Sequence, residues 1–456
     1  MIGKESQSFK DFFINLFNVI IQNNPFELLE KPKSTIGIKN YPNLRDHPLH
    51  SPEIWLEGKR KDDNLSGLWR IHNKLYDFND FIKIHPGGKD WLELTEGTDI
   101  TEAFESNHIS TLPEAFLPKY FIKTINTPRN SPFTFEKNDL YQTLKKNVRN
   151  EINKSSELIK SLQNKTKLIT DGLLLMFILT TSGCLLKESY LLGAISGLVL
   201  TLTSIAAHNF FHQKDNFRRF YFDLTTMSSR SWRISHALSH HLYTNTVYDF
   251  EISALEPFFQ YLTMKKNITV RYLSWIYTPI VYGLLYLGYF IRMCIQNVLD
   301  KKLFNTESYL PFILWTFLSI ITNQSIFVSI KMFVWVYLVS SFFVGVIGLN
   351  AGHHHPDVFH DGDYFESKSG IDWGLYQILA AMDRTETHKS HFWGLITFGD
   401  HIMHHLFPSL DHGALMFLYP TVEDTLKQFG IKLRTNSTFQ VAKGQFLQLS
   451  KVSVQI

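Results

Sequence analysis

Apolar side chains recur at helical spacing near the start of the chain. They fall on one face of a helix between residues 9 and 22: Phe9, Phe12, Phe13, Leu16, Phe17, Ile20 and Ile21. Polar residues interrupt the run, so it lacks the unbroken apolar region of a signal peptide, and Pro25 ends it. The pattern predicts an amphipathic helix that either packs on the rest of the protein or lies on a membrane surface.

Longer apolar stretches follow in the second part of the chain. Five of them stand out: 168–186, 190–207, 272–291, 310–321 and 326–349. The first two are each close to the roughly 20 residues that cross a bilayer. Only a few polar residues separate the first stretch from the second, and the fourth from the fifth, so each of these pairs predicts a helical hairpin.

Basic residues between the hairpins predict their orientation. They gather in the loop 213–271: Lys214, Arg218, Arg219, Arg230, Arg233, Lys265, Lys266 and Arg271. Since positive loops stay on the cytosolic side, we expect this loop in the cytosol and the hairpin tips opposite. We expect 310–349 to be the second spanning hairpin, with 272–291 interfacial or re-entrant. If 272–291 crosses and 310–321 does not, both domains and both termini still face the cytosol.

A polar region precedes the apolar stretches. Residues 68–71 and 75–78 predict two short strands joined by a tight turn, and the charged residues 136–166 predict a linker helix. The expected segments are an N-terminal amphipathic segment, a polar domain, a linker helix, a membrane domain and a C-terminal tail: 1–39, 40–130, 131–166, 167–430 and 431–456.

Composition narrows the chemistry. The mean hydropathy of −0.08 averages a polar domain with a membrane domain, so it does not indicate a soluble protein. Only 2 Cys accompany 20 His, which excludes a disulfide-stapled scaffold and a cysteine-based zinc or iron–sulfur site. A net charge of +3 gives no reason to expect a nucleic-acid partner. Imidazole nitrogen is therefore the candidate metal-binding group.

Two histidines in the polar domain form the first candidate site. His85 and His108 are separated by helical sequence, and Gly87 and Gly88 after His85 allow a sharp turn beside a flat cofactor. Two imidazoles on opposite sides of a haem iron leave no open position, which favours electron transfer. The alternative is that both are ordinary turn and core residues. With its His-Pro-Gly-Gly loop, the region 65–125 resembles cytochrome b5, and the resemblance implies that His85 and His108 ligate haem b.

The remaining histidines gather around the apolar stretches. Three clusters share the predicted cytosolic side: His208 and His212; His236, His240 and His241; His401, His404 and His405. Spacings of three and four residues place imidazoles on one helix face. Any single cluster arises easily by chance, but three converging clusters supply the neutral nitrogen ligands that a pair of metal ions needs.

This order of clusters resembles the membrane-bound fatty acyl desaturase and hydroxylase superfamily over about residues 165–425. The motifs are His208-x-x-x-His212, His236-x-x-x-His240-His241 and His401-x-x-His404-His405-Leu406-Phe407-Pro408. The whole chain resembles a cytochrome b5-fused desaturase, closest to the insect cytochrome b5-related proteins. The resemblance implies an α+β haem domain, then an all-α multi-pass membrane domain with a cytosolic histidine-rich cap, and two iron ions.

The resemblance also implies further residues. Similar enzymes place another histidine after the last span, so His354 is expected as a ninth ligand, with His353 and His355 as alternatives; Asn350 lies one predicted helical turn before His354. Apart from the resemblance, four carboxylates are candidates for orienting imidazoles, with a plain surface carboxylate as the alternative: Asp223, Asp249, Glu251 and Asp400. Front-end desaturases usually begin the third cluster with Gln, and His401 in its place weakens any assignment of where the double bond forms.

Three functions fit these features. The first is an O₂-dependent desaturase of an acyl lipid or acyl-CoA, with no catalytic residues beyond the metal ligands. The second is a hydroxylase on the same scaffold, and the third is a non-catalytic, membrane-anchored haem electron carrier. The complete histidine set favours an enzyme. The resemblance implies NADH–cytochrome b5 reductase as the electron source and the endoplasmic reticulum as the location.

Overall fold

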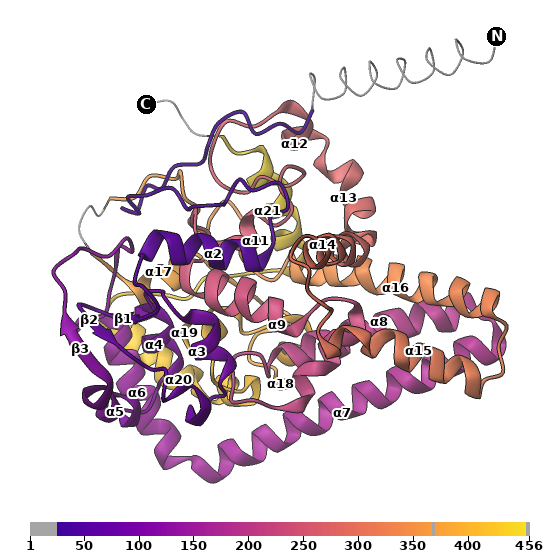
Figure 1. Ribbon diagram of the computed structural model, residues 1–456, viewed down its shortest axis with the longest axis horizontal. Coiled ribbons are helices and arrows are strands. Elements are labelled where there is room, and N and C mark those ends of the chain that lie inside the picture. The colour runs from indigo at the N-terminus through magenta and orange to yellow at the C-terminus, as the bar shows by residue number, and fades with distance from the viewer. Residues whose placement is uncertain (1–24, 367–369, 453–456) are drawn as a thin grey trace.

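Two parts of unlike composition follow one another along the chain (Figure 1). The computed structural model describes residues 25–366 and 370–452, so the helix expected at 9–22 lies outside the described residues. A small domain of helices and a three-stranded sheet comes first, and a larger helical part follows. The fold class predicted from the sequence is thereby confirmed.

The first domain is built on a small antiparallel sheet with the strand order β1-β2-β3. Its elements are α2 (Pro52–Asp63), β1 (Trp69–Ile71), β2 (Lys74–Tyr76), η1 (Ile82–Ile84), α3 (Asp90–Thr95), α4 (Thr101–Asn107), α5 (Leu112–Tyr120) and β3 (Phe121–Thr124). The predicted hairpin is confirmed, with Trp69 opposite Tyr76. β2 ends before residue 78 because the Asp77 carboxylate accepts the backbone N–H of Asn79 at 3.0 Å, which turns the chain.

A long helical hairpin links this domain to the rest. α6 (Leu140–Lys154) leads into α7 (Ser156–Lys187), and α8 (Tyr190–His208) returns beside it. The linker helix is thus in two pieces, since its second half is the start of α7. The Ser189 hydroxyl accepts the N–H of Leu192 and caps α8, so the connection stays as short as the sequence predicted.

A second hairpin packs against the first. It consists of α15 (Leu310–Ile321) and α16 (Ile326–Gly348). α8 and α16 approach so closely that a Cβ on Gly197 would lie 2.7 Å from the Val336 carbonyl oxygen. Thr201 donates to the Ser340 carbonyl at 3.0 Å across the same contact. Small residues and buried hydroxyl bonds of this kind hold helices together inside a bilayer.

The tyrosine-rich stretch 272–291 is divided into two helices. α13 (Ser274–Gly283) and α14 (Leu285–Leu299) meet at an angle of 62°. Among the described residues, α7, α8 and α16 are long and apolar enough to cross a membrane, and the bent pair makes a fourth candidate if it counts as one span. Figure 1 shows α14 nearly end-on, whereas α7, α8, α15 and α16 run across the view.

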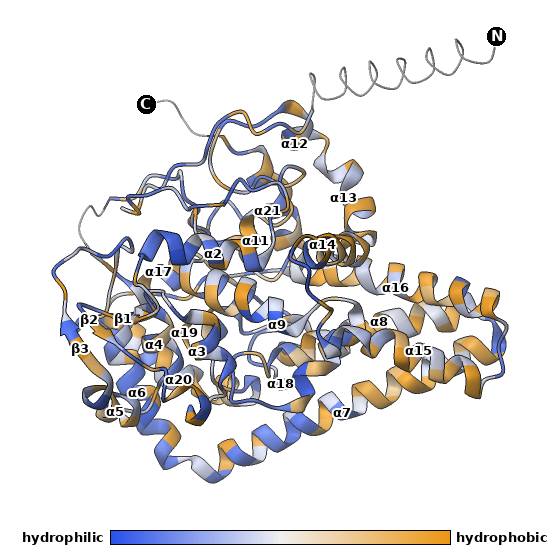
Figure 2. Ribbon diagram, viewed as in Figure 1, coloured by the Kyte–Doolittle hydropathy of each residue, from blue (hydrophilic) through white to orange (hydrophobic). Residues whose placement is uncertain are grey.

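Short elements form a cap over one end of the hairpins. In chain order they are β4 (Phe133–Thr134), η2 (Phe217–Thr225), α9 (Ser229–Trp232), η3 (Arg233–His240), α10 (His241–Tyr243), α11 (Phe250–Ser253), α12 (Ile268–Tyr272), η4 (Thr306–Tyr309), β5 (Ile371–Asp372), α17 (Trp373–Leu379), β6 (Asp383–Arg384), α18 (His391–Thr397), α19 (His401–Leu406), α20 (His412–Gln428), β7 (Thr435–Asn436) and α21 (Thr438–Ser450). Figure 2 shows the hairpins as mostly hydrophobic and the cap as mixed. The cap therefore has the polarity of a domain outside the bilayer.

The first domain docks on the cap through buried charges. The Asp90 carboxylate of α3 lies 3.3 Å from both Arg219 and Arg233, and Arg233 lies over the Trp91 ring at 4.7 Å. The N–H of Asp215 donates to the Gly87 carbonyl at 3.3 Å. These contacts hold the turn after His85 against the cap.

A second polar contact fixes the domain to α6. The Glu105 carboxylate of α4 accepts from Lys145 and from Gln142, each at 2.9 Å, and from His72 at 2.9 Å. The Lys145 side chain is only 2% exposed. Since a buried ammonium needs a partner, this contact orients the domain relative to the hairpin.

Candidate metal centre and haem pocket

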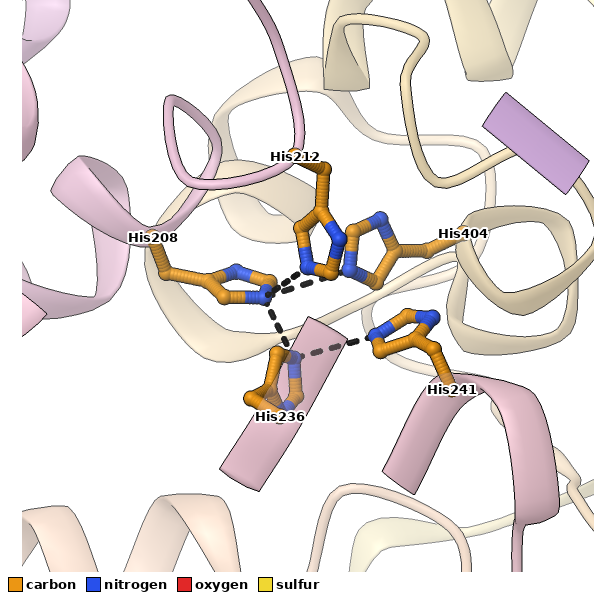
Figure 3. Close-up of side chains that lie close together, drawn as sticks. All are labelled: His208, His212, His236, His241 and His404. Carbon is orange, nitrogen blue, oxygen red and sulfur yellow. Dashed lines mark hydrogen bonds between the residues drawn. The ribbon is translucent and has the colours of Figure 1, made fainter. Parts of the chain in front are cut away.

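Five buried histidines converge at the cap end of α8 (Figure 3). The members are His208, His212, His236, His241 and His404, and one nitrogen of each lies within 4.8 Å of those of all the others. His208 Nε2 lies 2.7 Å from His236 Nε2, 3.3 Å from that of His212 and 3.2 Å from that of His404. We call these residues the first histidine group.

Hydrogen bonding alone does not account for the first histidine group. A neutral imidazole has one N–H and one lone pair, so His208 Nε2 cannot satisfy three facing nitrogens. Burial lowers the pKa of His212, His241 and His404 well below the usual imidazole range, and neighbouring imidazoles lower it further. The rings are therefore neutral at pH 7, with lone pairs that a cation at their centre would accept.

A second histidine group lies beside the first. It contains His240, His353 and His405, again with nitrogens within 4.8 Å of one another. His353 Nε2 lies 2.9 Å from His405 Nε2 and 2.6 Å from His401 Nε2, so His401 joins this group. The donors are all nitrogens and all buried, which suits a second transition-metal ion.

The local backbone divides the sequence clusters between the two groups. His236 lies in the π-helix η3, where residues five apart align, and His241 follows it with the Nε2 atoms 3.0 Å apart. The rings of His236 and His240 stack with centroids 5.4 Å apart, as a shared face predicts, and with Glu251 they form a third set of close donor atoms, while His240 also belongs to the second group. By contrast, α8 ends at His208, so His212 reaches the first group from a turn rather than from the same helix face.

Several of these rings are oriented by hydrogen-bond acceptors at Nδ1, whereas Nε2 faces the other histidines. His236 Nδ1 lies 3.0 Å from Glu251, and His240 Nδ1 lies 2.9 Å from Asp249, as expected for those two carboxylates. Such a bond fixes which ring nitrogen carries the proton and leaves Nε2 for a metal. Burial lowers the pKa of His240, but the Asp249 carboxylate outweighs burial and the net pKa is raised.

Two acceptors were not anticipated from the sequence. Gln377 Oε1 lies 3.0 Å from His405 Nδ1, and the Ala380 carbonyl lies 2.9 Å from His353 Nδ1. The sequence signal for the first is a lone amide in the short, otherwise largely apolar helix α17, where Gln377 is fully buried. The backbone carbonyl leaves no sequence signal.

Two of the expected carboxylates have other partners. Asp223 accepts the N–H of Ser229 at 2.9 Å, and Asp400 accepts the N–H of Lys389 at 2.7 Å. Neither is bonded to an imidazole of the two groups. The prediction that these two carboxylates orient imidazoles is therefore wrong. Asp400 lies next to His401 in sequence, but its left-handed backbone (φ 50°) directs its side chain elsewhere.

His354 does not lie in either group. Its ring stacks on Tyr261 with centroids 3.6 Å apart, and His353 occupies the place expected for it. The expectation assumed that the last helix continues to residue 354. α16 instead ends at Gly348, and the following turn directs His353 inward; Asn350 there donates to Val346 at 2.8 Å. His355 also lies apart, with Nδ1 3.5 Å from Asp357.

His85 and His108 face each other in the first domain. Their ring centroids are 6.4 Å apart. Two metal–nitrogen bonds of about 2 Å, plus about 1 Å from each nitrogen to its ring centre, amount to roughly 6 Å, so the pair fits one iron between them. Each Nδ1 is bonded to a backbone carbonyl, of Gly88 at 2.8 Å and of Phe104 at 2.9 Å, which leaves both Nε2 atoms for the metal.

A short chain of contacts joins this pair to the first histidine group. The Gly87 carbonyl bonds Asp215, whose carboxylate lies 2.8 Å from Arg233. Arg233 in turn donates to the Phe211 carbonyl at 3.2 Å, and His212 is the next residue. The loop at His85 and the first histidine group are therefore connected by hydrogen bonds and one ion pair.

An apolar cavity ends at the histidines. Its volume is about 550 Å³, and α13, α14, α11 and the cap end of α16 line part of it. His236, His240, His353 and His401 lie on its wall, and Trp232 stacks on His236 at 5.1 Å. A cavity of this size and polarity suits an alkyl chain.

Sequence comparisons agree with this geometry. The fatty acid desaturase family profile matches residues 188–437, and the cytochrome b5-like haem/steroid-binding domain profile matches residues 55–126. The cytochrome b5-related protein of Drosophila melanogaster is 37% identical and covers 93% of this chain and 97% of its own length.

More distant relatives are named as desaturases. The probable Delta(5) fatty acid desaturase C of Dictyostelium discoideum is 25% identical, over 85% of this chain and 92% of its own. The acyl-lipid (8-3)-desaturase of Physcomitrium patens is 25% identical, over 88% and 91% respectively. No solved structure matches the chain. With the two histidine groups and the haem-type pair in place, the chain belongs to the fatty acid desaturase family and carries a cytochrome b5-like domain in front of the desaturase domain.

Proposed function

We propose that the chain is a membrane-bound, O₂-dependent fatty acyl desaturase that receives electrons through its own haem domain. The observation that carries the proposal is the apolar cavity whose wall contains His236, His240, His353 and His401. An alkyl chain in this cavity gains roughly 0.8 kcal/mol for each CH₂ removed from water, so burial holds it beside the histidines.

The proposed ligands follow from the two groups. One iron would be held by the first histidine group, and the other by His240, His353 and His405 with His401, while His85 and His108 would hold haem b. When bound, the irons would supply O₂ activation for removing hydrogen from an unactivated C–H bond, and the haem would supply single electrons.

The protein's own residues have three tasks. Glu251 and Asp249 hold the imidazoles in the tautomer that binds metal. Trp232 and the apolar wall exclude water from the alkyl chain. The contacts among Asp90, Asp215 and Arg233 keep the haem domain docked.

The cellular setting belongs to the same proposal. NADH–cytochrome b5 reductase is the proposed electron source, and the endoplasmic reticulum is the proposed location. The two hairpins would cross the membrane, with α15 as its shortest span and with α13 and α14 at the cytosolic surface, since α14 lies across the hairpins. Both domains and both termini would then face the cytosol.

Lipid profiling tests the proposal. The chain is expressed in a host of known lipid composition, and its acyl chains are analysed by mass spectrometry. We expect a new double bond that disappears in His404→Ala and persists in His47→Ala, a control at an exposed histidine. A new hydroxyl group would instead identify a hydroxylase. No change in a protein loaded with both iron and haem would contradict catalysis and favour an electron carrier.

A further inference from the structure

A second cavity adjoins the apolar one. Its volume is about 510 Å³, and it shares Pro52, Tyr289 and Arg292 with the apolar cavity. The haem domain supplies one wall from α2 and α3, and α9 and α14 supply another. Its lining is mostly polar or charged, whereas that of its neighbour is mostly apolar. We call it the polar cavity.

Positive charge in the polar cavity is incompletely paired. Arg292 donates to the His50 carbonyl at 2.7 Å, and Arg60 donates to the Leu94 carbonyl at 2.9 Å. Among the described residues, neither guanidinium has a carboxylate within ion-pair distance, and Arg230 approaches Asp90 only at 3.6 Å. A guanidinium with spare N–H donors in a partly enclosed site is a binding group for phosphate.

The carboxylates of the polar cavity are mostly occupied. Glu57 pairs with Lys61 at 2.6 Å, and Glu93 pairs with Lys89 at 3.1 Å. Asp300 pairs with Lys302 at 3.2 Å. Glu53 accepts from the Ser231 hydroxyl at 2.5 Å and lacks a cationic partner among the described residues. The four cationic side chains of the lining balance its four acidic ones, so the groups that can bind an anion are the guanidiniums of Arg60 and Arg292, which have no carboxylate partner among the described residues.

α14 places this cavity at the level of lipid headgroups. Its outer face carries exposed apolar side chains at helical spacing: Leu287, Ile291, Ile295 and Val298. Its other face presents Tyr289, Arg292 and Gln296 to the polar cavity. A helix with one apolar face and one charged face lies in the membrane surface.

We propose that the polar cavity binds the phosphate-ester headgroup of an acyl phospholipid whose chain passes Tyr289 and Arg292 into the apolar cavity. The inference rests on the proposed function. The phosphodiester of a phospholipid carries one negative charge, which the guanidiniums of Arg60 and Arg292 can bind. The carrier of an acyl-CoA has several phosphates and would need a more strongly cationic site.

The proposal makes the haem domain part of the substrate site, because Arg60 comes from α2. Binding is measured by thermophoresis on full-length protein freed of iron by a chelator, so that the result does not depend on catalysis. The probes are palmitoyl lysophosphatidylcholine, palmitoyl-CoA and the uncharged methyl palmitate. The variants are Arg292→Gln, Arg60→Gln and Arg292→Lys, and Arg271→Gln is the matched control, since Arg271 also donates to a carbonyl but lines neither cavity.

We expect Arg292→Gln and Arg60→Gln each to weaken lysophosphatidylcholine binding about tenfold, in proportion to a lost charged hydrogen bond. Affinity for methyl palmitate stays unchanged, because it carries no charge. For lysophosphatidylcholine, Arg292→Lys retains part of the affinity and Arg271→Gln retains all of it. An unchanged haem spectrum verifies that each variant is folded.

Two results would overturn the inference. One is lysophosphatidylcholine affinity that neither glutamine substitution changes. The other is palmitoyl-CoA binding more tightly than lysophosphatidylcholine and weakened by the same substitutions, which would assign the cavity to the CoA carrier. Intact lysophosphatidylcholine binding in a protein that forms no new double bond would instead contradict the proposed function and leave this site in place.

Discussion

Asp90→Asn tests whether the docked haem domain serves the metal centre. Asp90 contacts Arg219 and Arg233 at 3.3 Å and Arg230 at 3.6 Å, from the domain that also holds His85. The substitution keeps the size of the side chain and removes its charge. It leaves the Arg233 side chain, which is 0% exposed, with Asp215 as its remaining carboxylate.

The size of the effect follows from burial. Removing one partner of a buried ion pair costs about 3–5 kcal/mol, largely because the other charge stays buried. The lower end of this free-energy range applies because Asp215 remains 2.8 Å from Arg233. About 3 kcal/mol corresponds to a shift of roughly a hundredfold toward the undocked arrangement. Adding Arg233→Gln removes the stranded charge, so the double variant should be less affected than the sum of the two single variants.

Two assays measure the shift of the haem domain toward the undocked arrangement. Reoxidation of the reduced haem is followed by stopped flow after mixing with O₂ and substrate, and tryptic cleavage within residues 125–139 is followed in metal-free protein. We expect slower reoxidation and faster cleavage in Asp90→Asn, with an unchanged haem spectrum. Asp80→Asn, at an exposed carboxylate of the same domain, is the control. Equal rates in both assays for Asp90→Asn and the parent protein would refute the reasoning.

Three further predictions concern other parts of the molecule. His353→Ala should lower the iron content measured by mass spectrometry and His354→Ala should not, whereas the opposite result would restore the sequence-based choice. Burial raises the pKa of Glu105, but its hydrogen bonds and the buried lysine of α6 lower it to about 2, so its contribution to stability is complete above pH 4.5 and is lost as pH falls toward 2. Glu105→Gln should cost about 3 kcal/mol in thermal unfolding at pH 7, and an unchanged melting temperature would count against the contact. Gly197→Ala should destabilise the hairpins by about 1–3 kcal/mol, while Gly172→Ala, which meets no atom within 4 Å, should have little effect.

The sequence predicted the elements whose signals are local and periodic. The strands at 69–71 and 74–76 and the hairpin of α7 and α8 follow from alternation and apolar length. The facing pair His85 and His108 was found because the turn between them has its own residue signature, and ring geometry now fits the pair to one iron.

The ligand sets were harder to predict because helix ends decide them. Spacing rules assume a continuous α-helix, but α8 ends at His208 and α16 at Gly348, so His212 and His353 approach from turns. The π-helix at His236 changes the period again, and no sequence pattern indicated it. Hence eight of the nine histidines proposed as ligands from the sequence lie in the two groups, while their division into groups required the fold.

α7 has a consequence for how a soluble reductase reaches the haem. The helix has 32 residues, of which the first dozen are mostly polar, so it is about 48 Å long and extends about 18 Å beyond its apolar part. Since α6 and the Glu105 contact fasten the haem domain to its base, this helix acts as a rigid stand-off from the bilayer. The reductase proposed as the electron source would therefore meet the haem domain at a set height and orientation. Because Asp90 also holds this domain to the cap through Arg219 and Arg233, inserting one helical turn of about 5 Å before residue 168 would set the two attachments against each other.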